Sequence, residues 1–293
     1  MKWLVTGAGG MLGHDVLEEL AGRGEQFVGL DRAALDITDP ASVDRAFAEH
    51  HPDVVVNCAA YTAVDDAETD EERALRINGE GPRLLACACA ASGARLVHVS
   101  TDYVFDGEAR STPYPENHST APRTAYGRTK LAGEQAVLEE LPGASAVVRT
   151  AWLYGACGGN FVRTMIELEA RRDTLDVVDD QHGQPTWTAD VAVRIADLGE
   201  RIGQVEGAHG VFHATSAGET SWHGLAQEVF RLIDADPERV RTTTSAAFVR
   251  PAPRPAYSAL GHERWREVGL EPPRDWRSAL HEALPHIRKE ISS

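Results

Sequence analysis

A glycine-rich turn near the start of the chain constrains the fold more than any other feature of the sequence. Residues 7–13 read GAGGMLG and lie between an apolar strand expected over residues 2–6 and a segment of helical periodicity over residues 11–21. A tight turn needs a residue that tolerates positive φ, and the close approach of a pyrophosphate, or of a helix to a strand, needs positions without side chains. An ordinary glycine turn would account for the triplet alone. Its place between the first strand and the first helix predicts a dinucleotide-binding βαβ unit, with the diphosphate on N–H groups at the helix N-terminus.

Strand and helix signals alternate through the first half of the chain. Apolar runs rich in β-branched residues, such as VVVN ending at Asn57, are separated by helical segments. Strands are expected over residues 2–6, 26–30, 53–57, 95–100 and 145–149, and helices over residues 11–21, 41–49, 71–92 and 124–141. Such runs indicate a parallel sheet buried on both faces, and right-handed crossovers then give a doubly wound, Rossmann-like α/β fold.

The rhythm changes after about residue 150, where helices expected near 160–171, 188–203 and 221–234 are joined by irregular stretches. We therefore expect a dinucleotide-binding domain over residues 1–150, rejoined by the helix near 188–203. Residues 151–293 are expected to form mainly a smaller, interleaved α/β substrate-binding domain. This second domain should close over the carboxyl edge of the sheet, where ligands of open α/β sheets bind.

Composition narrows the class of protein. The 29 lysines and arginines are outnumbered by 45 aspartates and glutamates, a net charge of −16, which argues against nucleic acid and anionic membrane surfaces as partners. Neither a signal peptide nor a run of 18 apolar residues is apparent, so a reducing cytoplasm is expected. The cysteines form no CxxC pair or zinc spacing and are expected to be buried small hydrophobes: Cys58, Cys87, Cys89 and Cys157.

Two neighbouring residues point to different cofactors. Asp31 ends the second expected strand, and Arg32 follows it directly. An acidic side chain at this point commonly binds the adenosine ribose hydroxyls, which favours NADH, whereas an arginine there favours the 2′-phosphate of NADPH. A solvated turn is the third interpretation, so the sequence predicts NADPH or NADH without choosing between them.

A tyrosine, a lysine and a threonine form the second chemical signal. Tyr126 and Lys130 are four residues apart in an expected helix and therefore share one face. A lysine ammonium beside a tyrosine favours the phenolate and lowers the phenol pKa from about 10, which would let the phenol exchange a proton with a carbonyl oxygen. Thr101 follows the fourth strand, where its hydroxyl can bind the same oxygen. A surface pair and a strand-end cap explain these residues singly, but their order after the glycine turn predicts catalysis at a carbonyl group.

These motifs resemble those of the extended short-chain dehydrogenase/reductases, and most closely the dTDP-4-dehydrorhamnose reductase family. The resemblance covers nearly the whole chain. It is carried by GAGGMLG (7–13), LDITDP (35–40), VVVNCAAYTAVDDAE (54–68), VSTDYVFDG (99–107), YGRTKLAGE (126–134), RTAWLYG (149–155), NFVRTM (160–165), DDQHGQPT (179–186) and RPAYSAL (254–260). One departure is Met11, where the family often has glutamine.

The resemblance implies NAD(P)H-dependent reduction of the C4 ketone of dTDP-4-dehydro-6-deoxy-L-mannose to dTDP-L-rhamnose. It makes Tyr126 the proton donor, Thr101 a hydrogen-bonding partner of the ketone, and Lys130 both the residue that tunes Tyr126 and a ligand of the nicotinamide ribose. The diphosphate would lie on Gly7, Gly10, Met11, Leu12 and Gly13, the adenine between Asp36 and Ile37, and the cofactor channel along Ala59, Ala60 and Thr62. The sugar pocket would be shaped by Asp102, Tyr103 and Trp152, with Arg254 and Ser258 near the nucleotide.

Several alternatives stay open. A reductase of a different nucleotide-linked 4-keto sugar fits the same motifs, and an epimerase fits them less well. A non-catalytic regulatory subunit shares the fold, but it has no need of the tyrosine–lysine pair. An acidic cluster beginning at Asp65 precedes the helix expected over residues 71–92, where negative charge is favourable, and part of it lies within a family segment. No metal site is predicted, a Mg²⁺ requirement is left open, and the chain is expected to be a monomer or a homodimer.

Overall fold

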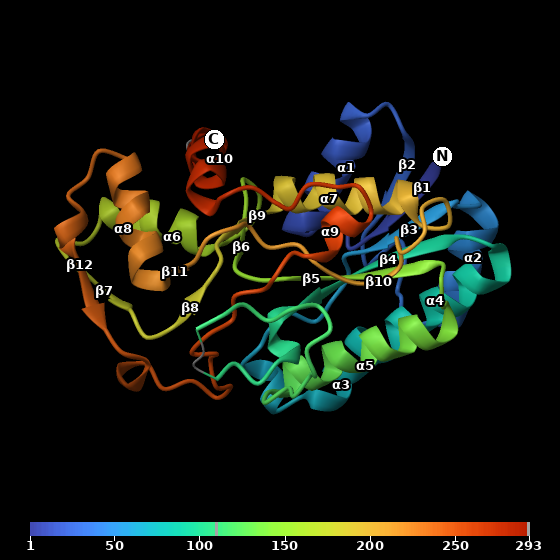
Figure 1. Ribbon diagram of the computed structural model, residues 1–293, viewed down its shortest axis with the longest axis horizontal. Coiled ribbons are helices and arrows are strands. Elements are labelled where there is room, and N and C mark those ends of the chain that lie inside the picture. The colour runs from blue at the N-terminus through green and yellow to red at the C-terminus, as the bar shows by residue number, and fades with distance from the viewer. Residues whose placement is uncertain (109–110, 292–293) are drawn as a thin grey trace.

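A six-stranded parallel sheet forms the centre of the computed structural model, which describes residues 1–108 and 111–291 (Figure 1). Its strands are β1 (Lys2–Thr6), β2 (Gln26–Leu30), β3 (Val54–Asn57), β4 (Arg95–Thr101), β5 (Ser145–Thr150) and β10 (Gly210–His213). They lie in the order β10-β5-β4-β3-β1-β2, and each adjacent pair is parallel. The chain reverses direction across the sheet between β1 and β3, which is where open α/β sheets bind ligands. The predicted doubly wound α/β fold is confirmed.

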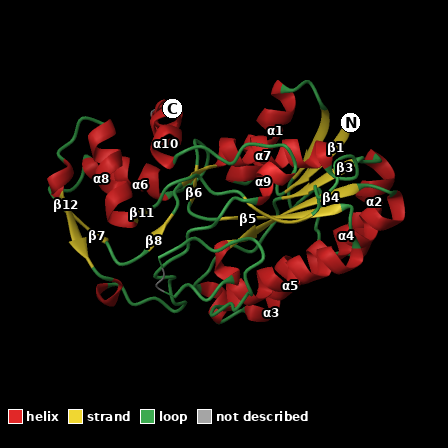
Figure 2. Ribbon diagram, in the orientation of Figure 1, coloured by secondary structure: helices red, strands yellow, loops and turns green. Residues whose placement is uncertain are grey.

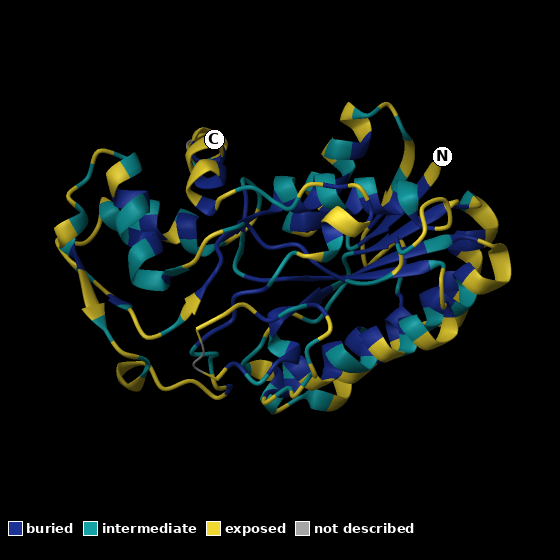
Figure 3. Ribbon diagram, in the orientation of Figure 1, coloured by how far each residue is buried: buried dark blue, intermediate teal, exposed yellow. Residues whose placement is uncertain are grey.

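Helices cover both faces of this sheet (Figure 2). On one face lie α1 (Met11–Gly22), α7 (Thr188–Arg201) and α9 (Arg264–Glu267); on the other lie α2 (Pro40–His50), α4 (Gly81–Ser92) and α5 (Ala125–Glu140). Alternate residues of one strand point to opposite faces, so Val5 packs with the first set of helices and Leu4 with the second. Figure 3 shows the resulting buried sheet between partly exposed helices.

The long helix expected over residues 71–92 is interrupted. It consists of α3 (Glu71–Leu75), a π-helical turn (Arg76–Glu80) and α4. Pro82 has no N–H to donate to the carbonyl of Asn78, and a Cβ at Gly133 of α5 would collide with that same carbonyl oxygen. The wide turn therefore forms where a proline frees a backbone carbonyl and α5 packs directly against it.

The remaining C-terminal elements form a third core beyond the carboxyl edge of the sheet (Figure 1). Its helices are α6 (Phe161–Glu169), α8 (Trp222–Leu232) and α10 (Trp276–Ile291). Short strand pairs join them: β7 (Leu175–Val178) with β12 (Val240–Thr243), β8 (His182–Gly183) with β11 (Thr220–Ser221), and β6 (Leu153–Tyr154) with β9 (Thr186–Trp187). The helices expected near 160–171, 188–203 and 221–234 correspond to α6, α7 and α8, whereas β10 and α10 were not anticipated.

No helix within residues 1–108 and 111–291 is long and apolar enough to span a bilayer. The cysteines in this part of the chain are all free, and only Cys89 is fully buried. Cys58 lies beside the cavity described below, and burial raises the pKa of its thiol to about 12. The expectation that all four cysteines are buried small hydrophobes is therefore wrong for Cys58, Cys87 and Cys157, which keep partial exposure.

Candidate active site

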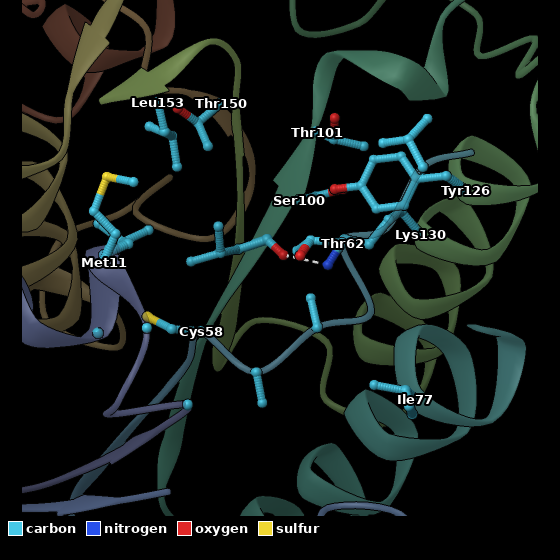
Figure 4. A pocket seen from close by; sticks show the side chains of 18 of the residues that line it. Met11, Cys58, Thr62, Ile77, Ser100, Thr101, Tyr126, Lys130, Thr150 and Leu153 are labelled. Carbon is cyan, nitrogen blue, oxygen red and sulfur yellow. Dashed lines mark hydrogen bonds between the residues drawn. The ribbon is translucent and has the colours of Figure 1, made fainter. Parts of the chain in front are cut away.

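A cavity of about 1020 Å³ opens at the carboxyl edge of the sheet, between the ends of its central strands and the C-terminal elements (Figure 4). Nearly every residue predicted for the site lines it. These residues are Gly7, Gly10, Met11, Leu12, Gly13, Asp31, Arg32, Asp36, Ile37, Ala59, Ala60, Thr62, Thr101, Asp102, Tyr103, Tyr126, Lys130, Trp152 and Arg254. Ser258 does not line the cavity and is buried behind it.

The glycine turn has the shape that its spacing predicts. Gly7 has a φ of +65°, and a Cβ there would lie 2.7 Å from the backbone nitrogen of Ala59. A Cβ at Gly13 would collide with the carbonyl oxygen of Gly7, which instead accepts a hydrogen bond from the Gly10 N–H at 2.9 Å. The turn therefore brings bare backbone and the N-terminus of α1 to the cavity, which suits a diphosphate.

The side chain of Met11 has a packing role. It lines the cavity at the first residue of α1, and a Cβ at Gly155 would lie 3.2 Å from its sulfur atom. Because a thioether is flexible and weakly polar, Met11 fills the space beside the β6 strand without needing a hydrogen-bond partner. A backbone contact to a ligand is unaffected by the methionine.

The carboxylates of Asp31 and Asp36 are both engaged by their own turns. Asp31 Oδ1 accepts the backbone N–H groups of Ala33 at 2.9 Å and Ala34 at 3.0 Å. Asp36 Oδ1 accepts from the Thr38 N–H at 2.9 Å and hydroxyl at 2.7 Å, and these bonds lower the pKa of the Asp36 carboxyl. Arg32 lies beside them on the cavity rim, so an acidic and a basic group both remain close to the expected ribose position.

Tyr126 and Lys130 project from the same face of α5 toward Thr101 at the end of β4 (Figure 4). Lys130 is buried, and its Nζ donates to the carbonyl oxygen of Val99 at 2.6 Å. Burial lowers the pKa of Lys130 to about 8, and the negative charge of Glu134 opposes this change. At pH 7 the ammonium form therefore still predominates.

The pKa of Tyr126 differs from the sequence-based expectation. Burial and the charge of Asp102 raise it to about 12, while hydrogen bonding to the Thr101 hydroxyl acts in the opposite direction. The sequence predicts that Lys130 lowers this pKa, but in the structure its ammonium donates to a backbone carbonyl. Tyr126 is thus protonated at neutral pH, as a proton donor must be.

Asp102 lies beside the hydroxyl of Thr101. Its Oδ1 accepts a hydrogen bond from the Thr101 hydroxyl at 2.8 Å, and the residue is only 5% exposed. Burial raises the pKa of its carboxyl to about 6, despite the hydrogen bond from Thr101. A carboxylate that titrates near neutrality thus adjoins both Thr101 and Tyr126.

Aromatic side chains close the cavity on the C-terminal side. Trp152 follows β5 in the left-handed region, with a φ of +48°, and its indole stacks on Trp222 with centroids 3.7 Å apart. The Tyr103 ring meets Tyr126 edge to face at 5.5 Å. Backbone strain in a bulky residue is typical of functional sites, and here the strained residue lines the cavity.

A buried ion pair supports α5 from behind. Both oxygens of Glu134 accept from Arg149 of β5, at 2.9 and 2.6 Å, and the two residues are 1% and 4% exposed. The Thr124 hydroxyl caps the start of the helix by accepting the Gly127 N–H at 3.0 Å. These contacts fix α5, which carries Tyr126 and Lys130, against the sheet.

Comparison with known proteins agrees with this geometry. The family model described as the RmlD substrate-binding domain matches residues 1–289. The chain belongs to the RmlD family. It is 62% identical to a probable dTDP-4,6-dihydroxy-2-methyloxan-3-one 4-ketoreductase of Streptomyces antibioticus, over 98% of this chain and 96% of that protein. It is 58% identical to a dTDP-4-dehydrorhamnose reductase of Streptomyces griseus, over 98% and 94%.

A solved structure extends the likeness to three dimensions. It is the dTDP-4-dehydrorhamnose reductase of Bacillus anthracis in complex with NADP, which is 37% identical with a TM-score of 0.91, over 97% of this chain and 98% of that one. The resemblance inferred from the motifs is thereby confirmed at the level of the RmlD family.

Within this member of the RmlD family, sequence reasoning missed several cavity residues. Thr150 and Gln181 lie in family segments but carry no local chemical signal. Trp222 follows the Ser221 cap of α8, and nothing in its spacing points to a site. His182, in the family segment 179–186, is exposed and does not line the cavity.

Proposed function

We propose that this protein is an NAD(P)H-dependent ketoreductase that converts dTDP-4-dehydro-6-deoxy-L-mannose to dTDP-L-rhamnose by reducing its C4 ketone. The observation that carries the proposal is the convergence of Thr101, Tyr126 and Lys130 on one cavity with the glycine turn. Membership of the RmlD family and the name of the 58% identical relative support the same substrate. The intact tyrosine–lysine pair speaks against a purely regulatory subunit.

The residues present fit a dinucleotide. Gly7 and Gly13 leave room that a Cβ would fill, and the N–H groups at the start of α1, with Met11 and Leu12, would hold the diphosphate. Asp36 and Ile37 would flank the adenine, and Ala59, Ala60 and Thr62 would line the channel. Asp31 and Arg32 both stand at the ribose end, so we propose NADPH or NADH. The bound cofactor supplies a hydride to the carbonyl carbon.

Side chains of this protein would stabilise and neutralise the negative charge that develops on the ketone oxygen. Tyr126 donates its phenolic proton to that oxygen, which completes the reduction of C=O to CH–OH. Thr101 hydrogen-bonds the same oxygen and orients the carbonyl. Lys130, mostly protonated at pH 7, would bind the nicotinamide ribose. Solvent then returns a proton to Tyr126.

The sugar would lie against the aromatic side of the cavity. Trp152 and Tyr103 offer apolar surface beside Thr101, which suits the methyl group of a 6-deoxy sugar. Asp102 would shape the same pocket, and Arg254 would lie toward the nucleotide. For Ser258, we propose an indirect role, because it is 3% exposed and packs behind the cavity wall near Gly183.

We also propose that the chain divides as the sequence suggests. Residues 1–150 would bind the dinucleotide together with β10, which is the sixth strand of the sheet, and α7, which packs on one face of it. The other elements after residue 150 would bind the substrate, and their separate apolar core supports this division. Residues 292–293, at the end of the proposed second domain, lie outside the described residues. A monomer or homodimer is proposed, which light scattering after size exclusion distinguishes.

The direct test is a coupled reductase assay. The 4-keto-L-sugar is generated in place from dTDP-glucose by a dehydratase and an epimerase, and absorbance at 340 nm is followed with NADPH and NADH in parallel. Rapid oxidation of either cofactor with dTDP-L-rhamnose as product supports the proposal and ranks the cofactors. Tight cofactor binding without oxidation would overturn it.

A different dTDP-linked 4-keto sugar is the second candidate, because the 62% identical relative bears the name of such a reductase. The same assay distinguishes the two if the intermediate before epimerisation is supplied in parallel. A higher kcat/KM for that D-configured 4-keto sugar would move the assignment from dTDP-L-rhamnose to another deoxysugar.

A further inference from the structure

Arg254, which lines the cavity, forms an ion pair with Asp65, a residue distant from it in the sequence. Asp65 lies in the segment after β3, and Arg254 lies 189 residues later in the stretch that covers the cavity. Arg254 Nη1 donates to Asp65 Oδ1 at 2.9 Å, and Nη2 donates to Oδ2 at 2.7 Å. The backbone N–H of Ala252 adds a bond to Oδ1 at 3.2 Å. This end-on, bidentate ion pair fixes both the position and the plane of the guanidinium.

Counting the donors of Arg254 shows what this pairing leaves available. A guanidinium carries five N–H donors. Two face Asp65, and the second donor of Nη1 reaches the carbonyl oxygen of Ala252 at 2.9 Å. Among the residues that the structure describes, Nε–H and the second N–H of Nη2 have no partner. These two N–H groups lie side by side along one edge of the guanidinium, and this edge matches two oxygens of a phosphate.

The guanidinium lies close to the catalytic tyrosine. Arg254 lines the cavity beside Tyr103, and its charge acts to lower the pKa of the Tyr103 phenol, against the effect of burial. Tyr103 in turn meets the Tyr126 ring edge to face at 5.5 Å. One aromatic ring therefore separates Arg254 from the proposed proton donor. In a nucleotide sugar, the diphosphate is attached at C1, across the sugar ring from the C4 ketone.

We propose that Asp65 positions Arg254 so that the Nε–Nη2 edge of its guanidinium binds the diphosphate of the nucleotide sugar. The inference rests on the proposed function, since it requires a diphosphate-linked substrate. Asp65 is a positioning residue: it touches Arg254 and not the substrate. Its negative charge opposes the diphosphate, but an arginine already held in one plane loses little freedom when the ligand binds.

Asp65→Asn tests the inference, because it removes the charge and one strong acceptor while keeping the size of the side chain. We expect the Kd of dTDP, measured by calorimetry, to rise roughly tenfold or more. The KM of the keto sugar should rise by a similar factor while kcat changes less than about twofold. The Kd of thymidine, which lacks the diphosphate, should not change, and neither should the Kd of NADPH, which also reports that the variant is folded.

Two further variants complete the experiment. Arg254→Lys keeps a positive charge but has no planar edge, so it should reproduce the loss of dTDP affinity even if Asp65→Asn folds poorly. Arg250→Gln is the matched control, because Arg250 approaches the same carboxylate at 3.7 Å from a position that is 59% exposed. It should leave the dTDP affinity nearly unchanged.

The outcomes separate this inference from the proposed function. Wild-type protein that binds dTDP, with Asp65→Asn binding it equally well or more tightly, overturns the positioning role of Asp65. An equal loss of thymidine and dTDP affinity also overturns it, because the loss would then not concern the diphosphate. Wild-type protein that does not bind dTDP at all overturns the proposed nucleotide carrier, and this inference with it.

Discussion

At the scale of single residues, burial sets the protonation states of the groups that we propose as catalytic. Burial raises the pKa of Tyr126 to about 12 and lowers that of Lys130 to about 8. Tyr126 therefore keeps its proton at neutral pH, as the proposed proton donor must, and Lys130 keeps its positive charge. Spacing alone identifies such a pair, but only the burial around it sets the direction of each pKa shift.

Removing the Tyr126 hydroxyl should slow the reaction strongly. In Tyr126→Phe, the ring remains but the ketone oxygen has no proton donor, so kcat should fall by roughly 10²–10⁴. Steady-state kinetics with the 4-keto sugar measures this, and cofactor affinity should stay near that of the wild type. Near-normal turnover in Tyr126→Phe would show that another group donates the proton.

Activity should decline above about pH 8. Because the pKa of Lys130 is lowered to about 8, the ammonium loses its proton in that range, and the charged donor proposed to bind the nicotinamide ribose is lost. A profile of kcat between pH 6 and 10 should show this alkaline limb. In Lys130→Met the limb should be absent and kcat low throughout; a limb that persists in this variant would belong to another group.

Asp102 should make the fold less stable at neutral pH than at acidic pH. The pKa of its carboxyl is about 6 in the folded protein, against 3.8 when unperturbed, so folding favours the protonated form. The stabilisation is complete below about pH 4 and is lost as the pH rises through 6, a difference of roughly 3 kcal/mol at most.

Asp102→Asn cannot ionise, so comparing its free energy of unfolding with that of the wild type shows whether ionised Asp102 destabilises the fold. Its free energy of unfolding in urea should exceed that of the wild type by roughly 1–3 kcal/mol at pH 8, and the excess should shrink toward pH 4. An excess that does not depend on pH would mean that Asp102 titrates in the folded protein as it does in the unfolded chain.

At the scale of elements, α5 presents Tyr126 and Lys130 to the cavity and is fixed by three contacts. Gly133 packs on the backbone of the π-helical turn, Thr124 caps the N-terminus, and Glu134 pairs with Arg149 of β5. Helical periodicity predicts α5 well because its pattern is local. The π-helical turn before α4 is not predictable in this way, since it depends on Pro82 and on contact with another helix.

Removing one partner of the buried Glu134–Arg149 ion pair should lower the free energy of unfolding. Glu134→Ala leaves the Arg149 guanidinium without its anion in a site only 4% exposed, so the free energy of unfolding should fall by roughly 3–5 kcal/mol. Chemical denaturation measures the change. The double variant Glu134→Met/Arg149→Leu should recover most of the lost free energy of unfolding, because an apolar pair of similar volume has no charge to desolvate. If the double variant is no more stable than Glu134→Ala, the loss of stability comes from lost packing and not from an unpaired charge.

At the scale of the whole molecule, a ligand that binds between the sheet and the C-terminal elements should stabilise the fold. NADPH at a hundredfold excess over its Kd should add about 2.7 kcal/mol, seen as a rise in Tm. Gly13→Ala should abolish the rise, because its Cβ collides with the Gly7 carbonyl and displaces the turn. Gly22→Ala, at the other end of α1 with nothing within 4 Å of its Cβ, should keep it.

The sequence by itself determined the features that repeat locally. Alternating β-branched runs and helices specified the doubly wound sheet, the glycine spacing specified a turn open to a diphosphate, and a four-residue interval placed Tyr126 and Lys130 on one helical face. Each of these depends on neighbours a few positions away, so a pattern in the sequence is sufficient.

Only the tertiary structure decided the rest. In the tertiary structure, β10 joins the sheet, and the indole of Trp222 stacks on that of Trp152. The carboxylate of Asp31 accepts a hydrogen bond from its own turn, and Ser258 does not line the cavity. The tertiary structure also brings Asp65 to Arg254 across 189 residues of chain. These contacts arise from the packing of distant segments, which has no local periodicity. For the same reason the pKa values of the catalytic groups, which depend on burial and on neighbours from other elements, were settled by the fold rather than by any motif.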